Sequence, residues 1–433
     1  MSTTPRNESN YYLYNQYGDN AMQPVAPVGI IPLRGSLGFS DSVNTYLHRR
    51  RVEYRETNPK HASGCPGFMR SDYRIGVDTL RFSSGEGKAV ISHTVRGHDI
   101  FILADVLNFS CTYDMFGVEN HMSPDDHYQD LKRTILAISG KARRVNVIMP
   151  FLYESRQHKR NSRESLDCAF MLEELYNLGV ANIITFDAHD SRVANAIPVG
   201  GFENISSTYQ MIKAMTHRIP DLQLTGSDLM VVSPDEGGIS RAMYYASMLN
   251  VPLGTFYKRR DYTKVINGRN PIVAHEFLGE SVEGMDILIV DDMISSGDSM
   301  LDIARELKER KARRIFCCAT FGLFTDGVAS FDKAYEEGLI TRVLSTNLIY
   351  RRPELLAAPW FIDVNMSKFV ALIIDALNHD ASLSGLMDPT EKIRKLIENQ
   401  KRRVTLDSAP VEPVEPVAAV APAEPAATEA TDL

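Results

Sequence analysis

Cysteine is scarce in this sequence, and its positions do not suggest a disulfide framework. The 433 residues include five cysteines, an odd number, scattered at Cys65, Cys111, Cys168, Cys317 and Cys318. Disulfide-rich domains and zinc sites place their cysteines in even sets or at short fixed spacings. We therefore expect reduced, mostly buried thiols in a cytoplasmic protein.

Long apolar runs and an excess of basic residues are also absent. No stretch approaches the roughly 18 apolar residues that a membrane-spanning helix needs, and the polar N-terminus has no signal-peptide core. The sequence has 47 Lys and Arg residues against 55 Asp and Glu residues, a formal net charge of −8. Nucleic-acid-binding domains are usually basic. We therefore expect neither a membrane nor a nucleic acid as partner.

What the sequence does contain is a regular alternation of short apolar runs and amphipathic stretches. Runs such as 100–103, 183–186 and 229–232 predict buried strands, and helical patterns follow most of them. Strands that alternate with helices form mainly parallel sheets. Because two such series follow one another, we predict an α/β fold with two domains, each a mainly parallel sheet flanked by helices.

Changes in composition set the expected domain boundaries. We predict an irregular N-terminal arm over residues 1–27, a first domain over 28–203 and a second domain over 204–403. Residues 108–126 are polar and aromatic and predict a long connection. Residues 404–433 contain no Lys, Arg or aromatic residue and are rich in Ala, Pro and Glu. Such a segment cannot bury a core, so it predicts a disordered acidic tail.

The most informative stretch is 287–299, which reads Ile-Leu-Ile-Val-Asp-Asp-Met-Ile-Ser-Ser-Gly-Asp-Ser. Its apolar run predicts a strand, and Asp291 and Asp292 stand at the expected strand end. Small residues follow, and a helical pattern begins at Met300. A loop of this kind presents backbone N–H groups and the positive end of a helix dipole to an anion, usually phosphate. The alternative is a polar turn with an N-cap serine.

Other polar residues also follow predicted strands. Asp187 and His189 end one strand, Asp235 follows another, and the Lys-Arg-Arg run at 258–260 follows a third. Ligands of parallel sheets bind beyond the C-terminal ends of the strands. Taken singly, these residues could be a buried histidine, a turn-forming aspartate and a solvated basic patch. Together with the phosphate loop, they indicate phosphoryl chemistry with Mg²⁺.

These segments resemble a known family. The loop at 290–299 resembles the 5-phosphoribosyl-1-diphosphate (PRPP) loop of type I phosphoribosyltransferase folds, and the other segments resemble those of the ribose-phosphate diphosphokinase (PRPP synthetase) family. The similarity runs from about residue 30 to about residue 396. The other segments, in order, are 81–86 (Arg-Phe-Ser-Ser-Gly-Glu), 95–101 (Val-Arg-Gly-His-Asp-Ile-Phe), 156–157 (Arg-Gln), 187–189 (Asp-Ala-His), 232–238 (Val-Ser-Pro-Asp-Glu-Gly-Gly) and 258–260 (Lys-Arg-Arg).

The resemblance implies a reaction and its binding residues. The 1-hydroxyl of ribose 5-phosphate attacks the β-phosphorus of MgATP, which gives PRPP and AMP for nucleotide biosynthesis. The implied metal ligands for Mg²⁺ are His189, Asp235 and Asp187. The residues implied for ribose 5-phosphate are Asp291, Asp292, Ser295, Ser296, Gly297, Asp298 and Ser299.

The resemblance also implies an ATP site and a catalytic pair. Arg156 and Gln157 would contact ATP, together with a turn that in the family reaches the nucleotide across a subunit contact. The residues of that turn are Phe82, Ser84, Gly85 and Glu86. A homo-oligomer built from dimers, such as a hexamer, is therefore implied. Lys258 and Arg260 would close over the transferring group and offset its developing charge.

The sequence departs from the family pattern at several of these positions. Ser84 stands where the family has aspartate, and Lys159 where it has arginine. In the loop, Ser295 replaces an aspartate that would contact the ribose, and Asp298 puts an anion near the phosphate. Two alternatives therefore stay open. One is a weakly active regulatory subunit that joins an active synthetase, and the other is a phosphoribosyltransferase that consumes PRPP.

Overall fold

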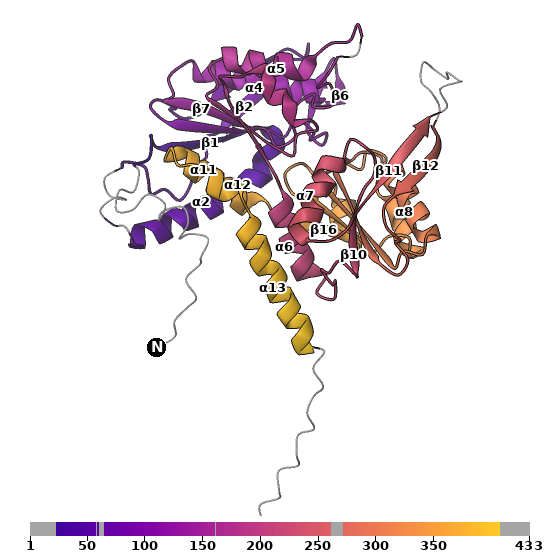
Figure 1. Ribbon diagram of the computed structural model, residues 1–433. Helices are drawn as coiled ribbons and strands as arrows, with labels where there is room; N and C mark the ends of the chain where they lie inside the picture. Colours follow the sequence, from indigo (N-terminus) through magenta and orange to yellow (C-terminus); the bar gives the residue numbers. More distant parts are fainter. Residues whose placement is uncertain (1–22, 58, 60–64, 161, 261–271, 408–433) are drawn as a thin grey trace, which may run out of the picture.

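The computed structural model describes residues 23–57, 59, 65–160, 162–260 and 272–407. Most of the predicted N-terminal arm and of the predicted acidic tail lies outside the described residues, as does the segment 261–271. The described part of the chain forms two α/β domains that lie side by side (Figure 1). Each has a mainly parallel sheet flanked by helices, which confirms the predicted fold class.

The first domain is built on a five-stranded parallel sheet in the order β1-β4-β7-β8-β9. All residues of β1 and β4 are buried, because helices α4 and α5 cover one face of the sheet and α2 covers the other (Figure 1). The bounds are β1 Val28–Pro32, α2 Leu37–Thr57, β4 Asp99–Leu103, α4 Pro124–Ile138, β7 Arg144–Ile148, α5 Asp167–Asn177, β8 Asn182–Phe186 and β9 Gly201–Ile205, with short 3₁₀ helices at Arg34–Ser36 and Ser191–Ala196.

Two antiparallel hairpins extend from this domain. One joins β2 (Val77–Arg81) to β3 (Gly87–Ile91), and the other joins β5 (Thr112–Met115) to β6 (Val118–His121). The second lies in 108–126, where the sequence predicts a connection without strands. Its strands are polar and largely exposed, so no apolar alternation marks them. The turn residues Phe116 and Gly117 both have positive φ, 51° and 78°, as two-residue hairpin turns require.

The second domain is built on a seven-stranded sheet in the order β12-β11-β10-β13-β14-β15-β16, in which only the β11–β12 pair is antiparallel. Helices α6, α7 and α13 pack on one face, and α8 and α9 pack on the other. The bounds are α6 Thr208–Arg218, β10 Leu229–Ser233, α7 Ile239–Leu249, β11 Leu253–Arg260, β12 Ile272–Leu278, β13 Asp286–Ile294, α8 Asp298–Glu309, β14 Arg314–Gly322, α9 Ala329–Glu336, β15 Arg342–Thr346, α10 Pro353–Ala357, β16 Phe361–Val364, α12 Ser384–Met387 and α13 Thr390–Asp407.

Strand β13 is longer than the sequence predicts. It continues to Ile294, so Asp291 and Asp292 lie within the strand and not beyond its end. The neighbouring β14 is equally long and pairs with β13 at Asp291, Met293 and Ile294. This pairing satisfies the backbone of the polar residues and explains why the strand continues. Helix α8 begins at Asp298 and buries the predicted apolar residues, Met300, Leu301, Ile303, Ala304 and Leu307.

The C-terminal part of the chain returns to the first domain. Helix α11 (Ser367–Asn378) packs against α2, and its Asp375 is buried in ion pairs with Arg50 and Arg51. Arg51 also donates to the Asn378 side chain at 2.8 Å. The predicted second domain therefore includes a helix whose core contacts belong to the first domain.

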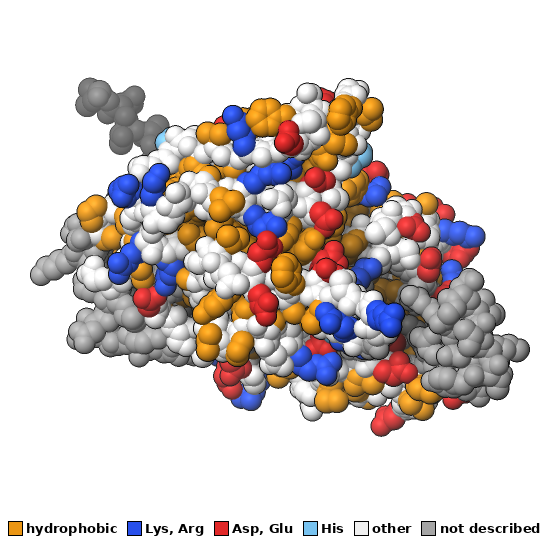
Figure 2. All heavy atoms as spheres, turned by 90° about the horizontal axis from the view of Figure 1, so that it is seen from above, with side chains coloured by type: hydrophobic (Ala, Val, Ile, Leu, Met, Phe, Trp, Pro, Cys, Tyr) orange, Lys and Arg blue, Asp and Glu red, His pale blue; other side chains and the backbone are white. Residues whose placement is uncertain are grey.

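Charged side chains of both signs are mixed over the face shown in Figure 2, with apolar side chains between them. Within the described part of the chain, no helix combines the length and the apolar character that crossing a membrane requires.

Candidate active site

The strand ends of the two domains meet at a contact between a histidine and an acidic pair. His189 follows β8 of the first domain, and Asp292 lies on β13 of the second. The His189 Nδ1 atom lies 2.8 Å from the Asp292 Oδ2 atom. The Asp292 side chain is 5% exposed and the His189 side chain 39% exposed, so the histidine covers the carboxylate from the solvent side. This contact defines the centre of the candidate site.

A third residue, Arg241 on α7, faces both carboxylates. Its Nη1 atom lies 3.8 Å from Asp291 Oδ1 and 3.8 Å from Asp292 Oδ1. Arg241 is not among the site residues predicted from the sequence. It follows the Pro-Asp-Glu-Gly-Gly segment by one helical turn, and that spacing is the signal that could have identified it. Its charge compensates two carboxylates that would otherwise repel each other.

The two carboxyl groups have opposite pKa shifts. Burial and the adjacent Asp292 carboxylate raise the pKa of Asp291. Burial would also raise the pKa of Asp292, but the hydrogen bond from His189 and the charge of Arg241 outweigh it and lower that pKa below the usual range. The pair can therefore hold a proton on Asp291 while Asp292 stays ionised, as interacting carboxylates do.

His189 is oriented for binding through its other ring nitrogen. The hydrogen bond to Asp292 raises the pKa of His189 and engages Nδ1, which leaves Nε2 for a ligand. A carboxylate that fixes a histidine in this way is the usual support of a metal-binding imidazole. Within the described residues, however, no three His, Cys, Asp or Glu side chains are grouped closely enough to hold a metal ion.

Asp187, one of the predicted metal ligands, joins the two domains. Its Oδ2 atom accepts hydrogen bonds from the Ser207 backbone N–H (3.0 Å), the Ser207 hydroxyl (2.7 Å) and the Thr320 hydroxyl (2.6 Å). Ser207 precedes α6, and Thr320 lies on β14. Asp187 has a φ of 38°, an unusual value for a residue with a side chain. These bonds stabilise the strained turn that presents His189.

Asp235 stands at the start of α7. Its Oδ1 atom accepts the backbone N–H groups of Gly237 (3.0 Å) and Gly238 (3.2 Å). A side chain at Gly238 would come within 2.8 Å of the Ser233 hydroxyl. The glycines therefore allow the backbone to turn tightly around the Asp235 carboxylate.

The predicted phosphate loop lies between β13 and α8. The carbonyl groups of Ile294 and Ser295 accept backbone N–H groups from Leu323 and Thr325, which fixes the loop against the end of β14. Gly297 has a φ of 94°, and a Cβ atom there would lie 2.2 Å from the Phe331 ring. Only glycine fits this position.

Asp298 occupies the first turn of α8 with its carboxylate turned back toward the loop. The Ser296 hydroxyl donates to Asp298 Oδ2 at 3.1 Å. The carboxylate thus lies at the positive end of the helix, where an anionic ligand would also bind. Ser299 is exposed on the same turn.

Arg156 and Gln157 lie on the loop after β7. Arg156 is exposed and reaches the second domain, where its Nε and Nη2 atoms lie 3.2 Å and 2.8 Å from the Met293 sulfur. Gln157 donates to the Ser165 carbonyl at 2.7 Å. The next residue, His158, has its ring 5.3 Å from the His189 ring. This places the predicted ATP-binding loop beside the centre of the site.

The turn at 82–86 lies on the β2–β3 hairpin. Phe82 is 53% exposed, and the Ser84 hydroxyl donates to the Glu86 carboxylate at 2.9 Å. Gly85 has a φ of 91° and packs against Met115 of the other hairpin. Among the described residues, no hydrogen bond or ion pair connects this turn to the His189–Asp292 contact.

The predicted catalytic pair lies at the end of β11. The backbones of Lys258 and Arg260 pair with His275 and Ile272 of β12. Their side chains are outside the described part of the molecule, so their roles stay predictions.

Comparisons with known proteins agree with this arrangement. The family model described as the N-terminal domain of ribose phosphate pyrophosphokinase matches residues 73–179. The model described as a phosphoribosyl transferase domain matches residues 201–336. The chain belongs to the ribose-phosphate pyrophosphokinase family. One match falls mainly on each domain, and the His189–Asp292 contact joins the two domains.

Related proteins cover most of the chain at modest identity. The chain is 29% identical to a ribose-phosphate pyrophosphokinase of Vibrio cholerae over 313 residues, which are 71% of this chain and 90% of that protein. It is 26% identical to one from a Nostoc species over 345 residues, 79% of this chain and 94% of that protein. A phosphoribosylpyrophosphate synthetase structure from Mycobacterium smegmatis has the same fold, with a TM-score of 0.63 and 19% identity, over 82% of this chain and all of that chain.

Proposed function

We propose that the protein is a ribose-phosphate diphosphokinase, which transfers the β,γ-diphosphoryl group of MgATP to the 1-hydroxyl of ribose 5-phosphate. The observation that carries the proposal is the contact of His189 with Asp292. It brings an imidazole of the first domain to an acidic pair followed by a phosphate loop on the second. The reaction needs the polyphosphate and the sugar hydroxyl to meet between two such surfaces.

Ribose 5-phosphate is assigned to the second domain. Asp291 and Asp292 would accept hydrogen bonds from ribose hydroxyls, and the backbone of 295–299 would bind the 5-phosphate at the start of α8. Because its pKa is raised even with Arg241 beside it, Asp291 is the carboxyl group suited to accept a proton from the attacking hydroxyl once the bound sugar favours its ionised form.

Mg²⁺ would be held at His189 and Asp235 together with oxygens of the polyphosphate. Mg²⁺ in nucleotide sites usually keeps few protein ligands and binds substrate phosphates, which is consistent with the lack of a three-ligand cluster among the described residues. The bound ion would offset charge on the polyphosphate. Asp187 accepts three hydrogen bonds at Oδ2 from residues of the second domain, and we assign it to positioning His189.

ATP is assigned to Arg156 and Gln157 of the first domain and to the 82–86 turn of a second subunit. The turn carries the exposed Phe82, and the neighbouring hairpin carries Phe116, which is 81% exposed, and Val118, which is 61% exposed. Apolar side chains gathered on two protruding hairpins favour burial against another subunit. We therefore propose a homo-oligomer whose contact delivers this turn to the nucleotide.

Lys258 and Arg260 are proposed to stabilise the charge that develops on the transferring group. A cation needed only in the transition state affects turnover more than binding. Lys258→Ala should therefore reduce turnover by about 100-fold or more with little effect on ribose 5-phosphate affinity.

A weakly active regulatory subunit is the second candidate, and one observation favours it. The Asp298 carboxylate lies at the helix start where the 5-phosphate would bind.

The test is AMP release from ribose 5-phosphate and MgATP by the purified protein, compared with Lys258→Ala. AMP release that Lys258→Ala abolishes supports the synthetase. An effect seen only after addition of another synthetase supports the regulatory subunit, and loss of PRPP on addition of a nucleobase supports a transferase.

A further inference from the structure

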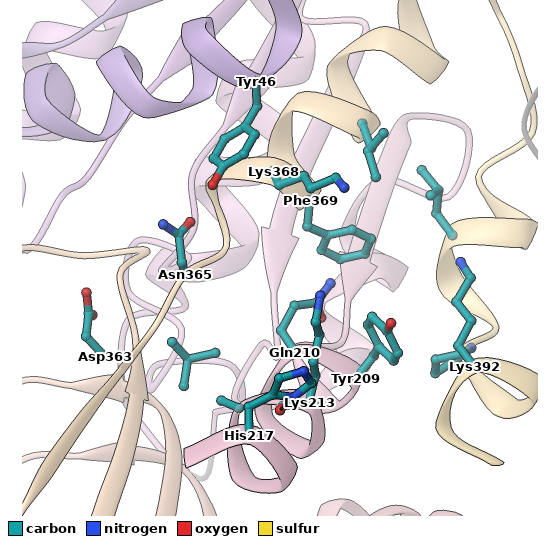
Figure 3. Close-up of a pocket in the computed structure, with 15 residues that line it drawn as sticks. Tyr46, Tyr209, Gln210, Lys213, His217, Asp363, Asn365, Lys368, Phe369 and Lys392 are labelled. Atoms are coloured by element: carbon teal, nitrogen blue, oxygen red, sulfur yellow. Dashed lines mark hydrogen bonds between the residues drawn. The ribbon is translucent and has the colours of Figure 1, made fainter. Parts of the chain in front are cut away.

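A cavity of about 360 Å³ lies between the two domains, and none of the residues assigned above lines it. Helices α2 and α11 of the first core line one side. Helix α6, the end of β16 and the start of α13 line the other (Figure 3). We call it the lysine cavity, after the three lysines in its lining, Lys213, Lys368 and Lys392.

Positive charge gathers at the lysine cavity, where Lys213 and Lys368 are exposed and Lys392 is half-buried. In the described part of the molecule, neither the Lys213 nor the Lys368 ammonium group forms an ion pair. Burial and the charge of Lys368 lower the pKa of Lys213. Burial also lowers the pKa of Lys392, although the nearby charge of Asp388 partly offsets this effect. The lining includes the acidic Asp363, but Asp363 is paired with Arg351 at 3.2 Å. Lys213 and Lys368 are close enough for the charge of one to act on the other, and Lys392 lines the same cavity. This arrangement favours binding of an anion.

The rest of the lining is apolar and aromatic. Phe369 and Leu386 are buried at the cavity wall, and Tyr46 and Tyr209 present their rings from α2 and α6 (Figure 3). The amide oxygen of Gln210 is buried and has no hydrogen-bond partner among the described residues. A ligand with a flat body would pack on the rings, and a small rotation of the Gln210 side chain would let a donor on that body satisfy the amide.

We propose that the lysine cavity binds a phosphate monoester with a flat, largely apolar body of about mononucleotide size. A phosphate dianion matches the lysines, and neither an uncharged aromatic molecule nor free phosphate would use the whole lining. The ligand would contact both domains. It would also contact α6, whose preceding residue Ser207 donates to Asp187 at 2.7 Å. Binding should therefore stabilise the arrangement of the two domains.

Pyridoxal 5′-phosphate is a suitable probe, because it combines a flat ring, a phosphate monoester and an aldehyde. The aldehyde condenses with a neutral lysine amine to give an imine and water, and borohydride reduces the imine to a stable secondary amine. Peptide mass spectrometry of the full-length protein then identifies the labelled lysine. We expect saturable labelling at Lys213, Lys368 or Lys392, about tenfold above that at Lys311 and Lys333, which lie outside the cavity.

Three comparisons decide the result. Pyridoxal, which lacks the phosphate, should label the cavity about tenfold less, since the charge-assisted contacts are lost. The Lys213→Met/Lys368→Met variant should lose saturable labelling at Lys392, whereas Lys333→Met should not. Equal labelling by the two aldehydes, or cavity labelling no stronger than at Lys311, would overturn the proposal. Labelling that inorganic phosphate prevents as effectively as a nucleoside monophosphate does would also overturn it, because the apolar body would then contribute nothing.

Discussion

Arg241 and His189 together compensate the charge of the acidic pair. Arg241 is 18% exposed and lies equally close to Asp291 and Asp292. Without it, two adjacent carboxylates would repel each other and also repel a sugar phosphate. Arg241 therefore affects the binding of ribose 5-phosphate indirectly, through Asp291 and Asp292, which are proposed to contact the sugar.

Arg241→Met should weaken ribose 5-phosphate binding about tenfold, which corresponds to about 1.4 kcal/mol. Arg241→Lys keeps the charge and should restore part of the affinity. Isothermal titration calorimetry measures both, and the melting temperature shows whether each variant is folded. An unchanged dissociation constant in Arg241→Met would contradict this role.

Asp298 should oppose binding of the 5-phosphate. Asp298→Asn removes a negative charge from the start of α8 but keeps the side chain that accepts from Ser296. We expect the KM for ribose 5-phosphate to fall about threefold to fivefold, since a charge a few ångströms away in a solvated site contributes up to about 1 kcal/mol. Asp302→Asn, one turn further along α8, is the control and should change the KM little.

Many of these residues were predictable from the sequence, and others were not. The sequence predicts Asp291, Asp292 and His189 as site residues because they follow apolar strand patterns, and the structure brings His189 into contact with Asp292. Arg241 was missed because its partners are distant in the chain and only the folded sheet brings α7 next to β13. The hydrogen bonds of Asp187 to Ser207 and Thr320 could not be predicted for the same reason.

At the scale of elements, helix α11 depends on a buried ionic contact. Asp375 is 1% exposed and lies between Arg50 and Arg51 of α2. Burial alone would raise the pKa of Asp375, but the charges of Arg50, His379 and Arg51 outweigh it and hold that pKa well below its usual range. The helix is thus joined to the first domain by charges that cannot be exposed to water without unfolding.

Asp375→Asn should lower the free energy of unfolding by about 3 kcal/mol, because it leaves two buried arginines without a counter-charge. Glu283→Gln breaks the exposed pair with Lys311 and should cost much less, because water and salt screen an exposed pair. Denaturant unfolding at neutral pH compares the two. Equal losses of unfolding free energy in the two variants would show that the buried contact does not stabilise the fold more than an exposed ion pair.

The same contact predicts a dependence on pH. Because the folded-state pKa of Asp375 is lowered, its stabilisation is fully present above its ordinary pKa of about 4 and is lost as the pH falls through the lowered value. The difference in unfolding free energy between wild type and Asp375→Asn should therefore shrink as the pH falls below about 4. If this free-energy difference instead grew as the pH fell, the predicted direction of the pH dependence would be wrong.

Helices and strands that bury one face were predictable from the spacing of their apolar residues. Helix α8 buries the expected residues. Strand β13 exceeded its predicted length because the support comes from β14, which local sequence does not reveal. The β5–β6 hairpin was missed because its strands are exposed and polar, so only the Phe116-Gly117 turn marks it.

At the scale of the whole molecule, the two hairpins of the first domain predict an oligomer. Phe116→Ser removes the most exposed of the apolar residues there, 81% exposed, and should shift the protein toward smaller species in light scattering coupled to gel filtration. The loss of a large apolar contact costs about 2 kcal/mol or more of association free energy. Leu136→Ser changes a residue on α4 that is 62% exposed and should leave assembly unchanged. An unchanged mass for Phe116→Ser would contradict the assigned contact.

The alternation of strands and helices in the sequence predicts the two-domain organisation. It does not predict that α11 packs on the first domain. The central claim is that the sites of both domains act together in one transfer of a diphosphoryl group. ³¹P NMR of the full-length protein with ribose 5-phosphate and MgATP tests it most directly. We predict equal growth of the signals of an anomeric diphosphate and of AMP, with no ADP. Formation of ADP with a singly phosphorylated C1, or no change that depends on ribose 5-phosphate, would contradict the account.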